Sequence, residues 1–344
     1  MKRFYCTTCR QQVFFSNTIC ENCRSDIGFD AEAINVVAFA PNSRPRCANF
    51  SLAGCNWLLT RFDDGNYCRA CRHNRKIPDL SLADNVRSWS EFERAKRRLF
   101  YALLVFGLPI RTRQEDATHG LAFECVDDVH TPGGDSLRAI TGHDNGVITI
   151  ALAEADPGRR EQARMALGET YRTLLGHLRH EIGHYYWDIL VRDRRDLLQR
   201  FRELFGNEQI DYAGALQMHY AKAPDDAWRG QYITSYASSH PWEDFAETWQ
   251  HYMHIVDTLD TARAFDLAVS DEQRREAQTA PFDAYHTRSI DRLIAAWTPL
   301  TIAVNCLNRS MGQPDLYPFV LTPPAIAKLD FVRDIVARAG ESGR

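Results

Sequence analysis

The pentapeptide His180-Glu181-Ile182-Gly183-His184 carries the strongest chemical signal in the chain. In an α-helix, residues four apart lie about 40° apart around the axis and about 6 Å apart along it, so both imidazoles can reach one ion. The glutamate after the first histidine is rotated by about 100°, which places it beside the ion and not on it. A general base for a zinc-activated water has to lie there. We therefore predict that His180 and His184 bind zinc and that Glu181 is the catalytic base.

The pentapeptide lies in a longer amphipathic pattern, which predicts one helix from about residue 161 to residue 191. Its apolar stripe consists of Leu167, Tyr171, Leu174, Leu175, Leu178, Ile182, Tyr185 and Ile189. A different face carries His177, His180, His184 and Asp188. A buried helix with its histidines segregated in this way favours a metal site over an accidental match to a short motif.

A zinc ion held by two histidines needs a third protein ligand. The extended motif with a third histidine is absent, because Leu190 stands at that position, so a downstream carboxylate is expected. The segment from Pro241 to Trp249 predicts a second amphipathic helix, whose packing face is formed by Phe245, Trp249, Tyr252 and Val256.

Glu243, Glu247 and His254 share the opposite face of this second helix. Two glutamates four residues apart fit one zinc ligand and one group that orients a ligand histidine. The alternative is a solvated acidic helix start, which the helix dipole favours.

Eight of the ten cysteines fall between residues 6 and 71, and they form two sets of four. The first set pairs two Cys-x2-Cys knuckles, each of which places two thiolates on a tight turn; it consists of Cys6, Cys9, Cys20 and Cys23. The second set has one knuckle and one wider pair; it consists of Cys47, Cys55, Cys68 and Cys71. We predict one structural zinc ion in each set, with ordinary buried cysteines as the alternative.

Other single residues carry weaker signals. His73 could replace a cysteine ligand, but it is expected to be an exposed loop residue, and Cys125 and Cys306 are expected in the core. Arg309 and Asp315 lie in a Gly- and Pro-bounded loop, where a packing or turn role is favoured over contact with a substrate.

The overall charge does not indicate that the chain binds nucleic acid, since the net charge is -4 and the pI is near 6.3. Residues 1–80 have an excess of four basic side chains, but two zinc ions with four thiolates each carry a formal charge of about -2 apiece and cancel it. We expect the cysteine modules to be structural or to contact protein, and nucleic acid is not an expected partner.

The sequence contains no run of about 20 apolar residues, so no membrane span is expected. The segment from Met1 to Cys6 has the charge of a signal peptide but lacks its apolar region, so the chain is expected to begin here, in the cytoplasm. In a reducing compartment, clustered cysteines indicate metal sites and not disulfides.

The composition of the chain changes near residue 80. The part before this position is rich in cysteine and is interrupted by Pro and Gly residues. A helix is predicted from about Ser88 until Pro109, strands at 121–123 and 147–150, and mainly helices from about residue 161. These elements predict an α+β fold with modules at 1–30 and 31–80 and a larger domain at 81–344. The strand at 146–152 is either an edge that pairs with an extended peptide or an ordinary interior strand.

The segment Thr234-Ser235-Tyr236, followed by Glu243-Asp244-Phe245-Ala246-Glu247, resembles the anthrax lethal factor type of gluzincin. In that type a tyrosine precedes the zinc-binding glutamate by seven residues and a second glutamate follows it by four. The spacing from Tyr236 to Glu243 is also seven. The resemblance implies that Glu243 is the third ligand, that Glu247 orients a ligand, and that Tyr236 donates its hydroxyl to the developing oxyanion.

Over nearly its whole length the chain is also similar to a bacterial family of zinc-binding metallopeptidases with an N-terminal zinc ribbon. The similarity rests on Cys55-Asn56-Trp57, Arg179 through Trp187, His240 through Thr248, Asn308 through Gly312 and Asp315 through Phe319. It implies a zincin-like, mainly helical metallopeptidase domain preceded by small zinc modules.

The combined prediction is a zinc-dependent hydrolase of peptide bonds with one catalytic and two structural zinc ions. Its expected partner is a peptide or protein substrate. Hydrolysis of an isopeptide or another amide would use the same site. The alternative from another class is a non-catalytic adaptor, whose zinc ribbons bind a protein or nucleic-acid partner on a degenerate peptidase scaffold. The oligomeric state stays open.

Overall fold

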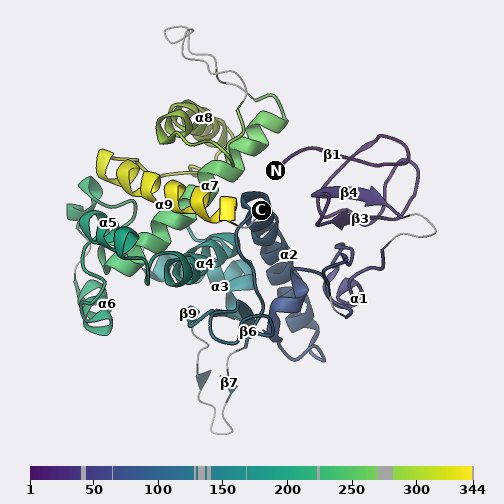
Figure 1. The fold of residues 1–344 in the computed structure, drawn as a ribbon, viewed down its shortest axis with the longest axis horizontal. Coiled ribbons are helices and arrows are strands. Elements are labelled where there is room, and N and C mark those ends of the chain that lie inside the picture. The colour runs from purple at the N-terminus through teal and green to yellow at the C-terminus, as the bar shows by residue number, and fades with distance from the viewer. Residues whose placement is uncertain are drawn as a thin grey trace. The chain divides into compact units, whose positions relative to one another are not determined.

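The computed structural model describes residues 1–39, 44–63, 65–127, 129–130, 136–137, 141–167, 169–222, 225–267, 269 and 282–342 (Figure 1). The chain divides into two compact units. The N-terminal unit comprises Lys2–Val105 and Pro109–Leu178. The C-terminal unit comprises Met1, Phe106–Leu108 and Arg179–Arg344.

The N-terminal unit contains all the described strands and three helices. The strands are β1 (Phe4–Tyr5), β2 (Gln12–Val13), β3 (Ile27–Asp30), β4 (Asn35–Ala38), β5 (Asn74–Lys76), β6 (Ala122–Val126), β7 (Val129–His130), β8 (Ser136–Leu137), β9 (Gly142–Asp144) and β10 (Val147–Ala151). The helices are α1 (Phe50–Ala53), α2 (Ala83–Phe106) and α3 (Pro157–Leu167). The pairs β1-β2, β3-β4 and β7-β8 are antiparallel.

The largest sheet has the strand order β5-β6-β10-β9. β6 pairs in parallel with β5 and β10, whereas β9 and β10 are antiparallel. Asn145 and Gly146 join β9 to β10 with positive φ angles of 45° and 84°, which is the backbone of a two-residue hairpin turn. The predicted strand near residues 147–150 is confirmed, but the option that it forms a sheet edge is wrong. The Asn-Gly turn folds β9 back onto it and makes it an interior strand.

An aromatic cluster joins the N-terminal strands to α2. The ring of Tyr101, on α2, lies 6.4 Å from that of Phe4, 5.5 Å from Phe15 and 6.0 Å from Phe29. Phe29 also packs on Trp57 at 4.8 Å, and all five side chains are almost fully buried. The first cysteine module is therefore not an isolated loop, because its core is shared with a long helix.

The C-terminal unit is helical. It contains α5 (Arg195–Phe205), α6 (Tyr212–Ala221), α7 (Pro241–Ala264), α8 (Ile290–Ser310) and α9 (Pro323–Ser342), together with the part of α4 (Leu174–Leu190) from Arg179 onward. Phe245 on α7 lies between Phe205 on α5 and Phe331 on α9, with ring separations of 5.7 and 6.4 Å. The buried core of this unit thus holds α7 in place, and α7 carries the two glutamates of interest.

The single helix predicted from about residue 161 to 191 is wrong in one respect, because the structure has two helices, α3 and α4. Thr173 precedes α4, and its hydroxyl oxygen accepts a hydrogen bond from the Gly176 amide at 3.0 Å. This bond starts a new helix, as an N-cap does. The apolar stripe continues across the interruption, so periodicity alone did not reveal it.

Two predictions about single residues are also wrong. His73 is buried, with Nε2 3.0 Å from the Ile110 carbonyl oxygen, and burial lowers its pKa to about 3. A neutral imidazole can donate to that carbonyl and fill the core at the same time. Cys306 is exposed on α8, whereas Cys125 is buried as predicted.

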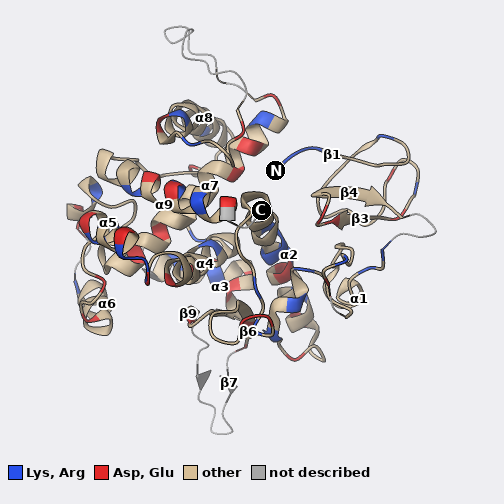
Figure 2. Ribbon diagram, in the orientation of Figure 1, with Lys and Arg blue, Asp and Glu red and all other residues tan. Residues whose placement is uncertain are grey.

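Among the described helices, α8 alone is long and apolar enough to cross a membrane by length and composition. One such helix is weak evidence, and α8 contains Pro299 and Arg309. Basic and acidic residues are interspersed along the described helices of both units (Figure 2).

Candidate metal centre

Close packing of α4 on α7 brings the predicted site residues together. A Cβ atom added to Gly183 would lie 3.0 Å from the Ala246 Cα and 3.1 Å from the Trp249 Cβ. The glycine in the pentapeptide is therefore where the two helix backbones approach each other most tightly among these residues. His180 and His184 flank it on α4, and Glu243 and Glu247 flank Ala246 on α7.

Three donor atoms converge from these two helices. His180 Nε2 lies 2.9 Å from Glu243 Oε2, and His184 Nε2 lies 3.5 Å from Glu243 Oε1. The donor atoms of the three residues all lie within 4.8 Å of one another. Ligand bonds of about 2.0–2.1 Å at tetrahedral angles require donor separations of about 3.3 Å, so these three residues fit a zinc ion.

The charges of the site also call for a cation. Glu243 and Glu247 are almost fully buried, and buried carboxylates need compensating positive charge. Burial alone would lower the pKa of His180, but its hydrogen bonds to Glu243 and Glu247 raise it well above its ordinary value. Burial would raise the pKa of Glu243, but His184 and His180 hold it well below its usual range. A dication between these groups would supply the same compensation.

A second glutamate contacts the other ring nitrogen of His180. Glu247 Oε1 lies 2.8 Å from His180 Nδ1, the ring nitrogen that faces away from the three-donor cluster. Thr234 in turn donates its hydroxyl to Glu247 Oε2 at 2.8 Å. A carboxylate on the second nitrogen of a ligand histidine fixes its tautomer and ring orientation. Sequence reasoning gave Glu247 this role but did not single out Thr234.

Glu181 and Tyr236 are close to the donors without being among them. Glu181 is buried on α4. Burial and then the charge of Glu243 raise the pKa of both Tyr212 and Tyr236, and the charge of Glu181 acts in the same direction. Tyr236 begins a short 3-10 turn (Tyr236–Ser238), and its ring lies 5.9 Å from the ring of His180. Burial, followed by the charge of Glu243, raises the pKa of Tyr236 well above its ordinary value, so the phenol stays protonated.

Sequence reasoning missed a second tyrosine. The Tyr212 hydroxyl lies 2.7 Å from Glu243 Oε1 and comes from α6, 31 residues before its partner. No helical period or motif spacing links these two positions. Only the folding of α6 back against the start of α7 brings them together.

A buried ion pair braces α7 beside the site. Lys328, on α9, donates to Asp244 Oδ2 at 2.6 Å and to the Gln231 carbonyl oxygen at 2.9 Å. Burial raises the pKa of Asp244 to about 7, against the opposing effect of Lys328. Because Asp244 follows Glu243 directly, this pair anchors the helix start that carries the third donor.

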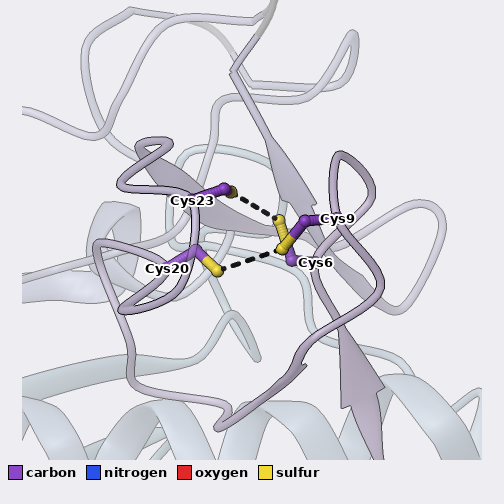
Figure 3. Close-up of side chains that lie close together, drawn as sticks. All are labelled: Cys6, Cys9, Cys20 and Cys23. Atoms are coloured by element: carbon purple, nitrogen blue, oxygen red, sulfur yellow. Dashed lines mark hydrogen bonds between the residues drawn. The ribbon is translucent and has the colours of Figure 1, made fainter.

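The two cysteine sets are assembled as predicted. Figure 3 shows the first, in which Cys6 and Cys23 have sulfur atoms 3.7 Å apart, and Cys9 and Cys20 have them 3.6 Å apart. The Arg10 amide donates to the Cys6 carbonyl at 2.9 Å, and the Arg24 amide donates to the Cys20 carbonyl at the same distance. The two knuckles therefore form the same kind of turn.

The second set is fully buried. Cys55 Sγ lies 3.8 Å from Cys68 Sγ and 3.7 Å from Cys71 Sγ, and Cys47 completes the group. A tetrahedron of Zn–S bonds of about 2.3 Å has edges of about 3.8 Å, so both sets fit zinc. In the described part of the chain, all ten cysteines are outside disulfides.

Arg309 and Asp315 pair with each other. Their side chains form a two-point ion pair on the surface, at 2.6 and 2.7 Å. The prediction that both lie in a loop is wrong for Arg309, which belongs to the last turn of α8, whereas Asp315 follows the helix. His119 is exposed in a turn, His143 lies in β9, and the side chain of His130 falls outside the described residues.

Two four-cysteine sites and a His-His-Glu centre with an adjacent glutamate on an α+β scaffold define a zinc-binding protein with peptidase-type ligands. The chain belongs to the family described as "Putative zinc-binding metallo-peptidase", which it matches over residues 85–335. Residues 3–82 match a zinc-ribbon domain.

The chain is 40% identical over 339 residues to uncharacterized proteins of Mycobacterium bovis and of two Mycobacterium tuberculosis strains. The matches cover 98% of this chain and 95% of each relative. No solved structure matches the chain.

Proposed function

We propose that this protein hydrolyses peptide bonds with a zinc-activated water. The observation that carries the proposal is the convergence of His180, His184 and Glu243 within 4.8 Å beside Glu181. Two of these donors flank the general-base position on one helix, which is the arrangement of a zinc hydrolase. The family supports zinc and peptidase chemistry in general terms.

A zinc ion held by these three residues would polarise the substrate carbonyl and lower the pKa of a bound water. Glu181 accepts the proton of the attacking water and passes it to the leaving amine. Tyr236 donates its hydroxyl to the oxygen that gains negative charge on the substrate. Glu247, held by Thr234, keeps His180 in the tautomer that directs Nε2 at the centre.

The 81–344 region would be a gluzincin-like domain, and the modules at 1–30 and 31–80 would each hold a structural zinc ion. One catalytic ion would bring the total to three per chain. The partner would be a peptide or protein substrate in the cytoplasm.

A library of quenched fluorescent peptides tests the proposal. The wild-type protein should cleave members of the library, a mild chelator should abolish cleavage, and stoichiometric zinc should restore it, because an open site loses its ion more readily than a closed thiolate site. An adaptor would instead leave the whole library intact when fully loaded with zinc. That result would end the peptidase proposal.

A further inference from the structure

The hydroxyl of Tyr212 is held directly against a zinc-ligand candidate. It lies 2.7 Å from Glu243 Oε1, a normal length for a hydroxyl–carboxylate hydrogen bond. An ionised carboxylate only accepts hydrogen bonds, so Tyr212 is the donor. Glu243 Oε2, the other oxygen of the same carboxylate, lies 2.9 Å from His180 Nε2.

The ring of Tyr212, which is 38% exposed, packs against the residues that flank Glu243. It packs edge-on against His240 at 5.1 Å and against Trp242 at 6.0 Å. His240 also caps α7, because its Nδ1 accepts from the Trp242 amide at 3.0 Å. The first turn of α7 therefore carries the carboxylate and also packs against the phenol ring that α6 supplies.

We propose that Tyr212 is a positioning residue of the metal centre, whose hydroxyl holds one oxygen of Glu243 and leaves the other for the ion. This inference rests on the metal centre of the proposed function. A carboxylate held at one oxygen loses less freedom when its other oxygen binds, and this raises the affinity for the ion.

Tyr236 has a different role in this scheme. Within the part of the chain that the structure describes, no hydrogen bond of its hydroxyl is found, and its ring faces His180. Under the proposed function its hydroxyl is left for the substrate, whereas that of Tyr212 is engaged with a ligand candidate. The two tyrosines form a matched pair for an experiment, because both can lose a hydroxyl and keep their ring.

Zinc affinity of the three-residue centre tests the inference in the full-length protein. With both cysteine sites loaded, competition against a chromophoric chelator should show about 10- to 100-fold weaker zinc binding in Tyr212→Phe than in wild type. Tyr236→Phe should bind zinc as wild type does. Thermal unfolding of the protein without the labile ion should stay cooperative in all three, because Phe keeps the ring contacts, with at most the small loss expected from the one hydrogen bond that Tyr212→Phe removes.

Wild-type zinc affinity in Tyr212→Phe would overturn the inference, and so would an equal loss in Tyr236→Phe. Loss of the cooperative unfolding transition of Tyr212→Phe without the labile ion would also overturn it, because it would show a general packing role. These outcomes do not depend on hydrolysis. If no peptide were cleaved and Tyr212→Phe still bound zinc more weakly, the proposed function would fail and the positioning role would stand.

Discussion

His180 shows how one side chain can be fixed from both ends. Its Nδ1 faces Glu247 and its Nε2 faces Glu243, so rotation of the ring would break one contact or the other. Thr234 and Tyr212 extend the chain of hydrogen bonds by one step beyond each glutamate. At the residue scale the centre is therefore one hydrogen-bonded network. Some of its members are candidates to bind the ion, and others orient those ligands.

The two glutamates give the first test at the residue scale. Glu243→Ala removes a direct ligand and should abolish zinc binding at the three-residue centre. Glu247→Ala only loosens the orientation of His180, so it should keep the site with about 10- to 100-fold weaker zinc binding. Metal analysis after dialysis against a weak chelator measures both. The reverse order of losses would make Glu247 the ligand.

Helical spacing was sufficient to predict that His180 and His184 share one helix face and that Glu243 and Glu247 share another. The resemblance to the gluzincin type then implied that Glu243 completes the histidine pair and that Glu247 orients a ligand. Sequence patterns did not identify Tyr212 and Thr234 as members of the centre. Their contacts with Glu243 and Glu247 span 31 and 13 residues and depend on how loops fold back, which no local period encodes.

At the scale of elements, the contact of α4 with α7 controls the site. Gly183 and Ala246 allow the two helix backbones to approach, and this approach brings the histidines of one helix within bonding reach of the carboxylates of the other. The sequence indicated both helices and their polar faces. It did not indicate the break before α4, since Thr173 acts through a cap and leaves the apolar stripe undisturbed.

Gly183→Ala tests this contact. The added methyl would meet the Ala246 Cα at 3.0 Å, and neither it nor the Trp249 Cβ can swing aside. Overpacking of this kind costs about 1–3 kcal/mol, against a gain of about 1 kcal/mol in helix propensity. We expect a net loss of stability in chemical denaturation and weaker zinc binding at the three-residue centre.

Gly230→Ala is the matched control, because an added Cβ there meets nothing within 4 Å. It should leave both the unfolding free energy and zinc binding unchanged. If Gly183→Ala also matched wild type in both measurements, close approach of α4 and α7 would not be what assembles the centre.

At the scale of the whole molecule, the two kinds of candidate zinc site belong to different units of the chain. All eight ribbon cysteines lie in the N-terminal unit, and His180, His184 and Glu243 lie in the C-terminal unit. In the N-terminal unit, α2 contacts both cysteine modules: Tyr101 packs on the first, and Glu93 Oε2 lies 3.3 Å from Cys71 Sγ in the second.

Buried cations on α2 accompany the second cysteine set. Lys96 donates to Glu93 Oε1 at 2.5 Å, and Arg97 lies 4.0 Å from Glu93 Oε2. Burial would lower the pKa of Arg97, but the nearby thiolate of Cys55 and the carboxylate of Glu93 raise it. Lys96 and Arg97 together offset the formal charge of about -2 that a zinc ion with four thiolates would carry at this set.

The composition shift near residue 80 could be read from the sequence, since cysteine spacing is a local signal. The packing of both modules on α2 could not be predicted from the sequence, because Tyr101 and Glu93 occupy positions that any amphipathic helix would have. The division of the chain into modules at 1–30, 31–80 and 81–344 stays a prediction.

Glu181→Gln tests the central claim most directly, because it removes only the ability to accept a proton and keeps the size and most hydrogen bonding of the side chain. The variant should unfold like wild type, retain about three zinc ions per chain, and still bind a peptide or a hydroxamate. Its cleavage of peptides that the wild-type protein hydrolyses should fall by at least about 100-fold, the low end of what a positioned general base contributes. Peptide hydrolysis at the wild-type rate by zinc-loaded Glu181→Gln would contradict the account.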